Sequence, residues 1–278
     1  MTALGRWPLR GMAAGLALWM GAAFAGERYR TPFLKAPVPI PAPGETAAAA
    51  AARNLPEPLS REEFSQSPFS MMGKLTFRSG AFIYDGSATL VRPKVALTAG
   101  HNLWDPRDGW SVGVRFDRAK YGGEEASSTP AREIYLYSSR YMDFASRNPS
   151  SARAFAWDVG WVVFSRRPAR GKAAPMSAAA GKLRGAREWR AMGYGQDFHS
   201  GALPLSVAPT AGFRRVLGAY FENATYGTEG GMSGGPVFVK SGTRWVVVAV
   251  VVSGYADYSA SGVRALEPGL VRALKFAR

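Results

Sequence analysis

The chain contains no cysteine and only two histidines among its 278 residues. The absence of cysteine excludes disulfides, thiolate nucleophiles and cysteine-ligated zinc. Two histidines are too few for a histidine-rich metal site, and no loop has the ligand pattern of a calcium site. We therefore expect a protein that folds and works without a metal or cofactor.

Acidic residues are also scarce, with 20 Asp and Glu against 35 Lys and Arg, which gives a formal net charge of +15. A strongly basic chain can adhere to anionic surfaces without specificity. The basic residues are scattered, with local pairs at Arg166-Arg167 and Arg214-Arg215, and no basic run is interleaved with aromatic residues. This pattern favours a solubilising basic surface over a specific nucleic-acid site.

Long hydrophobic runs are absent outside the N-terminus. Arg6 and Arg10 precede an uncharged stretch of 15 residues that ends in Ala23-Phe24-Ala25. This pattern is typical of a secretory signal peptide over residues 1–25, because the stretch is short for a membrane span. An uncleaved N-terminal anchor is the alternative. We expect a secreted or periplasmic protein with no transmembrane segment after cleavage, which lowers the net charge to +13 (15 − 2).

Residues 26–65 do not have the pattern of a packed domain. Six prolines between positions 35 and 60 surround the alanine run Ala47–Ala52. Closely spaced prolines favour an extended spacer, and six alanines are too few for a stable isolated helix. The segment is interpreted as a linker or as a removable pro-segment, and the sequence does not choose between them.

From residue 66 onward the sequence has many short β-like stretches. Asp85-Gly86 is a strong hairpin signal, and Lys240–Thr243 predicts a second hairpin between two apolar strands. Pro268 can begin a terminal helix. Many short strands indicate an all-β barrel or sandwich, and the length fits two units of roughly 100 residues each. The predicted boundaries are 66–170 and 171–278, the latter with the terminal helix.

The segment Gly231-Met232-Ser233-Gly234-Gly235-Pro236 carries the strongest chemical signal. A serine hydroxyl becomes a nucleophile when a neighbouring base takes its proton. Flanking glycines permit a tight turn and let backbone N–H groups approach a developing oxyanion, with Gly231 and Ser233 as the expected donors. A glycine-rich hairpin loop without catalytic function is the alternative.

Chain order distinguishes the catalytic folds that could use Ser233. An α/β-hydrolase needs its histidine after the serine, but His101 and His199 both precede Ser233. The order Asp158, His199, Ser233 belongs to an α/β fold, whereas the pattern here is β. The order His101, Asp158, Ser233 is that of chymotrypsin-like enzymes.

Four segments resemble motifs of the trypsin/chymotrypsin family of serine peptidases. Val95–His101 resembles its Leu-Thr-Ala-Ala-His motif, Trp157–Phe164 its Asp-Ile-Ala-Leu segment, and Gly231–Pro236 its Gly-Asp-Ser-Gly-Gly-Pro motif. Gly193–Gly195 is similar to the Gly-Trp-Gly of the second barrel. The resemblance covers roughly residues 68–270. It implies two six-stranded antiparallel β-barrels and a serine endopeptidase that acts through an acyl-enzyme.

The resemblance assigns the catalytic triad. Ser233 is expected to attack the scissile carbonyl, His101 to transfer the proton, and Asp158 to fix the tautomer of His101. Asp158 is preferred over three other aspartates because only Asp158 leads directly into an apolar strand; these are Asp143, Asp117 and Asp105. His199 is expected to be a loop residue without a catalytic role. An inactive homologue that binds peptides is the alternative function.

Substrate specificity is less well marked. Met232 stands where trypsin-type enzymes have the aspartate that pairs with a new N-terminus, so the chain is closer to the bacterial glutamyl-endopeptidase (V8-like) branch. By that resemblance Thr228 lines the specificity pocket, and the strand that pairs with substrate includes the residues Val251, Val252, Ser253 and Gly254. Val251 replaces the histidine used for glutamate recognition, and no acidic residue occupies the pocket base near Gly227. We expect a monomer that cleaves protein or peptide substrates after an apolar or small residue.

Overall fold

The computed structural model describes residues 55–122, 127–168, 173–178, 180–186, 188–196, 201–208, 212–255 and 260–277. The predicted signal peptide lies outside the described residues, as does most of the predicted linker. Within the described ranges, no helix is both long enough and apolar enough to cross a membrane.

The first half of the described chain forms a closed antiparallel barrel of six strands in the order β2-β3-β4-β9-β8-β7. Its strands are β2 (Met72–Ser79), β3 (Phe82–Arg92), β4 (Val95–Thr98), β7 (Val112–Arg118), β8 (Ser128–Leu136) and β9 (Gly160–Phe164). Inward-facing apolar side chains of these strands fill the barrel. A two-stranded ribbon of β5 (Trp104–Asp105) and β6 (Gly109–Trp110) follows β4.

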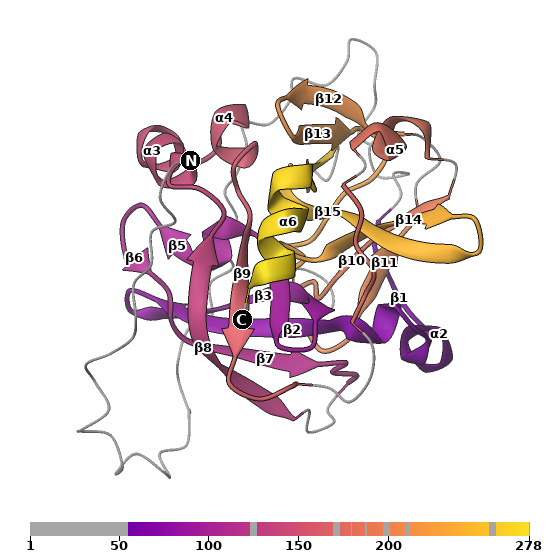
Figure 1. Cartoon of the computed structure of the whole chain (residues 1–278), viewed down its shortest axis with the longest axis horizontal. Coiled ribbons are helices and arrows are strands. Elements are labelled where there is room, and N and C mark those ends of the chain that lie inside the picture. Colours follow the sequence, from indigo (N-terminus) through magenta and orange to yellow (C-terminus); the bar gives the residue numbers. More distant parts are fainter. Residues whose placement is uncertain are drawn as a thin grey trace.

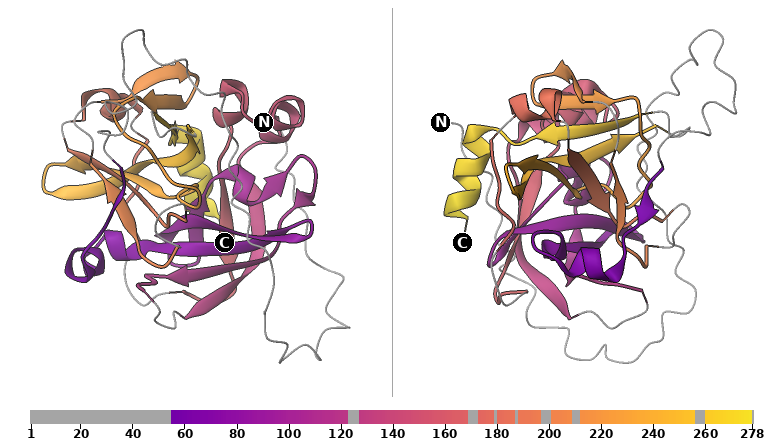
Figure 2. Two further views of the ribbon diagram at one scale, coloured as in Figure 1. Left: turned by 180° about the vertical axis from the view of Figure 1, so that it is seen from behind. Right: turned by 90° about the vertical axis from the view of Figure 1, so that its right-hand side faces the viewer.

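The second half forms one eight-stranded antiparallel sheet in the order β1-β11-β10-β14-β15-β16-β13-β12. Its strands are β1 (Glu57–Pro58), β10 (Trp189–Gly193), β11 (Leu205–Val207), β12 (Arg214–Leu217), β13 (Tyr220–Asn223), β14 (Pro236–Ser241), β15 (Arg244–Gly254) and β16 (Ser261–Ala265). Figure 1 shows the barrel and this sheet side by side, and the rotated views of Figure 2 show the same two units.

The all-β class and a closed six-stranded barrel are confirmed, but the second unit has eight strands in its sheet instead of six. Two features raise the number. β1 adds a strand from the N-terminal segment, and the turn at Gly218, with φ of 55°, separates β12 from β13.

The hairpin turn expected at Asp85-Gly86 is wrong. β3 runs without interruption from Phe82 to Arg92, and the turn that precedes it contains Gly80, which has φ of 56°. The Asp85 carboxylate forms an ion pair with Lys74 and a hydrogen bond with Thr76. It therefore does not need to lie in a solvent-exposed turn. The hairpin at Lys240–Thr243 is confirmed, since β14 ends at Ser241 and β15 begins at Arg244.

Helices are few and short. The terminal helix is confirmed as α6 (Pro268–Phe276), with Leu270 and Leu274 buried, and Figures 1 and 2 show it on the outside of the strands. Four further helices were not predicted: α2 (Arg61–Ser65), α3 (Arg140–Arg147), α4 (Ala152–Phe155) and α5 (Ala180–Gly185). They connect strands and leave the all-β architecture unchanged.

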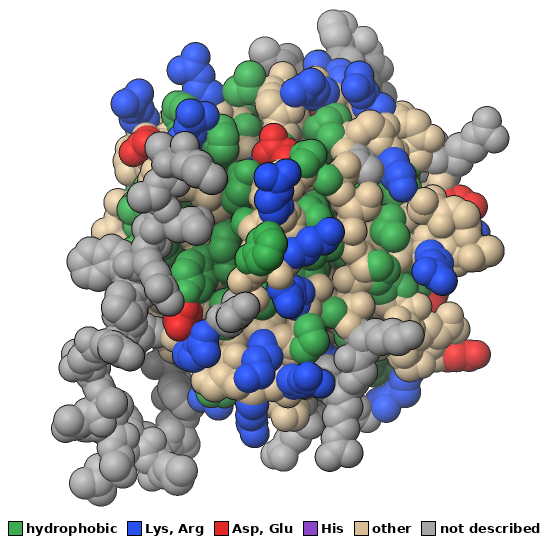
Figure 3. All heavy atoms as spheres, in the orientation of Figure 1, with side chains coloured by type: hydrophobic (Ala, Val, Ile, Leu, Met, Phe, Trp, Pro, Cys, Tyr) green, Lys and Arg blue, Asp and Glu red, His purple; other side chains and the backbone are tan. Residues whose placement is uncertain are grey.

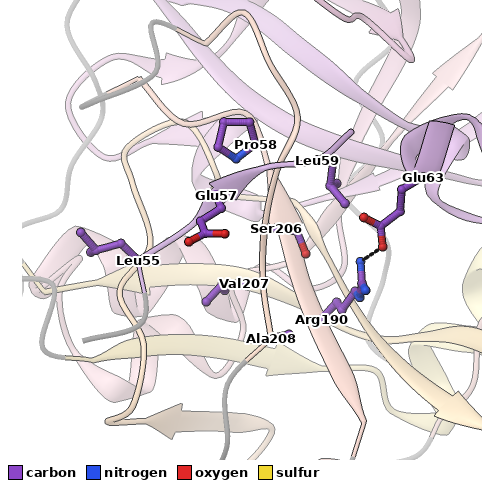
Figure 4. Close-up of a pocket in the computed structure, with 9 residues that line it drawn as sticks. All are labelled: Leu55, Glu57, Pro58, Leu59, Glu63, Arg190, Ser206, Val207 and Ala208. Carbon is purple, nitrogen blue, oxygen red and sulfur yellow. Dashed lines mark hydrogen bonds and ion pairs between the residues drawn. The ribbon is translucent and has the colours of Figure 1, made fainter. Parts of the chain in front are cut away.

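Residues 55–65, which fall within the predicted linker, pack against the second sheet. β1 pairs with β11, and Leu59 and Phe64 are buried. Figure 4 shows a pocket between this segment and β10–β11, in which Glu63 forms an ion pair with Arg190. The Arg190 guanidinium also lies over an aromatic ring, 5.6 Å from the Phe69 centroid. The structure therefore places packed elements in the last part of the predicted linker.

Two hydrophobic cores hold the molecule together. The larger core fills the barrel and continues into the second unit through Met192, Tyr194 and Phe238. The smaller core lies within the second sheet. On the face shown in Figure 3, Lys and Arg side chains are scattered among apolar and neutral groups. The continuous larger core fixes the barrel against the sheet, which lets residues from both units meet at one site.

Candidate active site

His101 lies directly after an apolar strand of the barrel. All four residues of β4 are buried, and the short 3₁₀ turn Gly100–Asn102 follows it. Space for a side chain is tight at Gly100, because a Cβ atom would lie 3.0 Å from Asp158 Oδ1 and 3.1 Å from Leu136 Cδ2. The close approach of this turn to Asp158 sets the position of the imidazole.

His101 and Asp158 form the central pair of the site. His101 Nδ1 lies 2.6 Å from Asp158 Oδ2, and the backbone N–H of His101 donates to Asp158 Oδ1 over 2.8 Å. Asp158 is fully buried between α4 and β9. A carboxylate accepts hydrogen bonds, so Nδ1 carries the proton and Nε2 is left with a free lone pair. No described protein atom forms a hydrogen bond with His101 Nε2, although that atom is buried.

The other three aspartates considered for this role lie elsewhere. The Asp105 carboxylate accepts from the backbone N–H groups of Arg107 and Asp108, at 2.8 and 3.2 Å. Asp143 is exposed on α3, and Asp117 is on β7. Of these four aspartates, Asp158 is the one that forms hydrogen bonds with His101 among the described residues. His199 lies outside the described residues.

Ser233 occupies a tight turn that leads into β14. Gly231 and Gly234 have φ of 89° and 84°, a backbone conformation that favours glycine. A Cβ atom at Gly234 would lie 2.1 Å from Thr98 Oγ1 and 2.3 Å from the Ser87 carbonyl oxygen. The glycines of the motif are thus needed for the turn to lie directly against the barrel.

Hydrogen bonds from the barrel hold the serine turn next to His101. The Ser233 carbonyl accepts from the backbone N–H of Ser87 over 2.8 Å and from Asn102 Nδ2 over 2.9 Å. Asn102 directly follows His101, so this hydrogen bond joins the neighbour of the candidate base to the candidate nucleophile itself. The Ser233 hydroxyl itself forms no hydrogen bond with another described residue.

The Ser87 hydroxyl provides a second connection between the two units. It is fully buried, donates to the Gly231 carbonyl over 2.8 Å and accepts from the Tyr194 backbone N–H over 2.9 Å. Because its proton and one lone pair are both engaged, the hydroxyl orientation is fixed. It links β3, the segment after β10 and the serine turn.

The carbonyl groups around Ser233 set the direction of two backbone N–H groups. The Gly230 carbonyl accepts from Gln196 N over 2.8 Å, and the Met232 carbonyl accepts from Gly235 N over 2.9 Å. In a trans peptide the C=O and N–H bonds point in opposite directions. The N–H groups of Gly231 and Ser233 therefore point away from these partners, and neither donates to another described residue.

The expected pocket residues come together on the second sheet. The Thr228 hydroxyl accepts from Ser261 Oγ over 3.0 Å and lies 3.5 Å from the Ser253 carbonyl, so Thr228 adjoins β15 as expected. The Ser253 hydroxyl lies 2.9 Å from Tyr220 Oη, which donates to Glu222 Oε1 over 2.8 Å. The side chains of Ser253, Tyr220 and Glu222 thus form a chain of two hydroxyl groups that ends at a carboxylate.

The four residues of the strand expected to pair with substrate, Val251–Gly254, form the end of β15. Val251 accepts from Gly234 N over 2.8 Å and donates to the Gly235 carbonyl over 2.9 Å, so its backbone is engaged by the serine turn. Val252 is buried at a register shift, and Gly254 pairs with Ser261 at the end of β15. Val252, Ser253 and Gly254 remain as the candidate residues for substrate pairing.

Burial controls the electrostatics behind the His101–Asp158 pair. Burial raises the pKa of Tyr141, and the charges of Asp158 and Asp105 raise it further. Burial lowers the pKa of the Arg264 guanidinium, while Glu267 and the more distant Asp158 favour its charged form. Arg264 donates to Glu267 Oε2 over 2.6 Å and to the Ala265 carbonyl over 2.7 Å. The His101–Asp158 pair thus lies near the neutral phenol of Tyr141 and the Arg264 guanidinium, whose charge is balanced by Glu267.

No group of three or more histidine, cysteine or acidic side chains within the described ranges could hold a metal ion. The sequence motifs found His101, Asp158 and Ser233, but they did not identify Ser87, Asn102 or Gln196. The position of Asn102 directly after His101 was the only local signal for any of these, because their partners are distant in the sequence.

Comparisons with known proteins bear on the fold. No protein-family model matches the chain, and no curated protein matches it. Solved structures of serine proteases are similar to it, among them the following three. The thermostable serine protease AL20 from an extremophilic microorganism is 21% identical with a TM-score of 0.59, and the match covers 73% of this chain and 94% of that one.

The protease Anisep from Arthrobacter nicotinovorans is 18% identical with a TM-score of 0.59, covering 75% of this chain and 95% of that one. A Glu endopeptidase in complex with MPD is 14% identical with a TM-score of 0.62, covering 81% and 97%. The likeness extends over nearly the whole of each of these proteases. The chain therefore has the fold of chymotrypsin-like serine proteases.

Proposed function

We propose that this chain is an exported serine endopeptidase that hydrolyses peptide bonds with His101, Asp158 and Ser233. The observation that carries the proposal is the fully buried Asp158 carboxylate, which accepts from both Nδ1 and the backbone N–H of His101. A buried carboxylate that fixes one imidazole nitrogen leaves the other as a base. Asn102 and Ser87 hold the backbone of Ser233 next to that base.

The reaction follows from these positions. Ser233 Oγ attacks the substrate carbonyl while His101 Nε2 takes its proton. The N–H groups of Gly231 and Ser233, which have no acceptor among the described residues, stabilise the oxyanion. His101 then protonates the leaving amine, and an acyl-enzyme forms on Ser233. Water, activated by His101, releases the second product and regenerates the serine.

Location and substrate class belong to the same proposal. Residues 1–25 are proposed to direct export to the periplasm or the medium, where a chain without cysteine depends on its two hydrophobic cores for stability. The substrates are proteins or peptides. The residues proposed to contact them are Thr228, Val252, Ser253 and Gly254.

One observation favours a second candidate function, an inactive homologue that binds peptides. Ser233 Oγ and His101 Nε2 form no hydrogen bond with each other. Catalytic hydrogen bonds in free enzymes are often long and tighten only with substrate. We therefore favour an active endopeptidase over an inactive homologue.

A fluorophosphonate probe tests the two functions directly, because it phosphonylates only a serine that a neighbouring base activates. The wild-type protein and the exposed-site control Ser165→Ala should be labelled, and Ser233→Ala should not. Failure of the folded, processed wild-type protein to react would overturn the enzyme proposal and favour the binding function.

A further inference from the structure

A buried ionic cluster lies on the barrel side of the serine turn. Asp85, on β3, is 5% exposed, and its Oδ2 lies 2.7 Å from Lys74 Nζ. The Thr76 hydroxyl donates to Asp85 Oδ1 over 2.8 Å. Lys74 is also buried, at 9% exposure. A buried charge pair of this kind is costly to form unless each group has well-placed partners.

The last partner of Asp85 comes from the second unit. Gln196 Nε2 donates to Asp85 Oδ2 over 2.5 Å. Gln196 follows β10 closely, and it belongs to neither the triad nor the expected pocket. The side-chain amide therefore connects the second unit to a carboxylate whose position is fixed within the barrel by Lys74 and Thr76.

The same glutamine contacts the candidate oxyanion hole in two other ways. Its backbone N–H donates to the Gly230 carbonyl over 2.8 Å. Its Cγ atom packs against Gly231, where a Cβ atom would lie 3.2 Å away. The Gly230–Gly231 peptide is thus oriented by Gln196, and its N–H is directed to the opposite side.

We infer that Gln196 is a positioning residue for the oxyanion hole and that Asp85 holds it in place. The inference rests on the proposed function. Asp85 fixes the side chain of Gln196, and the fixed residue keeps its backbone N–H on the Gly230 carbonyl. The Gly231 N–H is then presented to the substrate before binding, without an ion pair at Met232.

Preorganised donors matter more in the transition state than in the ground state, because negative charge develops on the oxygen only during attack. Loss of the Asp85–Gln196 hydrogen bond should therefore lower kcat and leave KM nearly unchanged. Removal of a whole oxyanion donor costs about 100-fold to 1,000-fold in kcat. Misdirection of one donor should cost less, roughly 10-fold to 100-fold.

The test is Gln196→Met in the full chain, with Gln66→Met as the matched control. Methionine retains the length and the apolar contact with Gly231 but removes the amide. Gln66 is exposed at the end of α2. Acylation by p-nitrophenyl acetate is measured per active site, together with inhibition by phenylboronic acid, which forms a tetrahedral adduct with an activated serine.

Gln196→Met should acylate roughly 10-fold to 100-fold more slowly and bind phenylboronic acid more weakly by a similar factor, while Gln66→Met should match wild type. Equal acylation by Gln196→Met and wild type would overturn the inference. So would a loss explained entirely by a smaller folded fraction in thermal unfolding.

If Gln196→Met does not fold, Gln196→Asn, whose shorter amide cannot reach Asp85, gives the same comparison. An unreactive wild-type protein would instead contradict the proposed function.

Discussion

At the scale of single residues, Asp158 is the group whose chemistry is most constrained, because both carboxylate oxygens accept hydrogen bonds from His101. In Asp158→Asn one acceptor becomes an NH₂ donor. The imidazole is then favoured in the tautomer that protonates Nε2, which cannot take the serine proton. We expect kcat to fall on the order of 10⁴-fold with the fold retained.

The measurement is ester and peptide hydrolysis by purified Asp158→Asn, with circular dichroism to establish folding. Asp143→Asn, on the exposed face of α3, is the matched control and should have wild-type activity. Full activity in Asp158→Asn would show that another group orients His101.

A second prediction concerns the lack of room for a side chain at Gly234. An alanine Cβ at this position would meet Thr98 Oγ1 and the fixed Ser87 carbonyl, at 2.1 and 2.3 Å. At Gly242, which also has a positive φ, nothing lies within 4 Å of a Cβ atom. Gly242→Ala should therefore cost about 1–2 kcal/mol of left-handed strain, and Gly234→Ala more than about 4 kcal/mol.

Urea denaturation of both glycine variants gives the comparison. Equal losses of unfolding free energy in the two variants would mean that the serine turn can move away from β3. That result would also weaken the case that barrel contacts position Ser233.

At the scale of elements, the short helix α2 tests where the folded part of the chain begins. Phe64 is its only buried residue and packs in the larger core. Phe64→Ala should lower the free energy of unfolding by about 3–5 kcal/mol, the usual cost for a large buried aromatic. Glu62→Ala, on the exposed side of the same helix, should change it by less than about 0.5 kcal/mol.

Chemical denaturation measures both effects. A negligible effect of Phe64→Ala would support the prediction that the segment up to residue 65 is only a linker. The expected loss would place the boundary of the folded unit before Phe64 and leave any removable segment upstream of it.

Strand periodicity predicted most of the elements, and the exceptions have physical causes. Asp85-Gly86 has the composition of a turn, but Asp85 is solvated by Lys74 and Thr76 within β3, which local sequence does not reveal. The helix α3 was missed because only Tyr141 and Ala145 are fully buried, and apolar and charged side chains are mixed along its eight residues. In both segments, tertiary contacts and not local secondary-structure propensity determined which element forms.

At the scale of the whole molecule, burial of tyrosines links stability to alkaline pH. Burial is the largest cause of a raised pKa in four of them: Tyr141, Tyr194, Tyr220 and Tyr226. Unfolded tyrosines ionise near pH 10, while these stay protonated in the folded state. Above pH 10 the unfolded chain binds fewer protons, so the free energy of unfolding falls as pH rises.

Tyr226→Phe isolates one contribution, because the Tyr226 hydroxyl has no hydrogen-bond partner among the described residues. The variant should match or exceed wild-type stability at pH 8. Above pH 10 its stability should fall less steeply, by up to about 1.4 kcal/mol per pH unit. Urea denaturation between pH 8 and pH 11 measures both slopes, and identical slopes would contradict this role of burial.

The sequence predicted the candidate site only where the functional residues belong to a motif of neighbouring residues in the chain. His101, Asp158 and Ser233 each sit in a local motif, and their order excluded other hydrolase folds. Asn102 and Ser233 are separated by 131 positions, and Gln196 and Asp85 by 111. Such contacts depend on how the barrel meets the second sheet, which no local pattern encodes.

The pairing of β1 with β11 has a consequence for how the chain acquires its structure. Pro58 leaves the ribosome 147 residues before its partner Leu205. The segment around β1 is therefore synthesised among the first described residues but cannot dock until its partner strand β11 (Leu205–Val207) has been made. Pairings across such separations are slow to form. All six barrel strands are complete by Phe164, before β11 is made, so closure of the barrel should precede attachment of this segment.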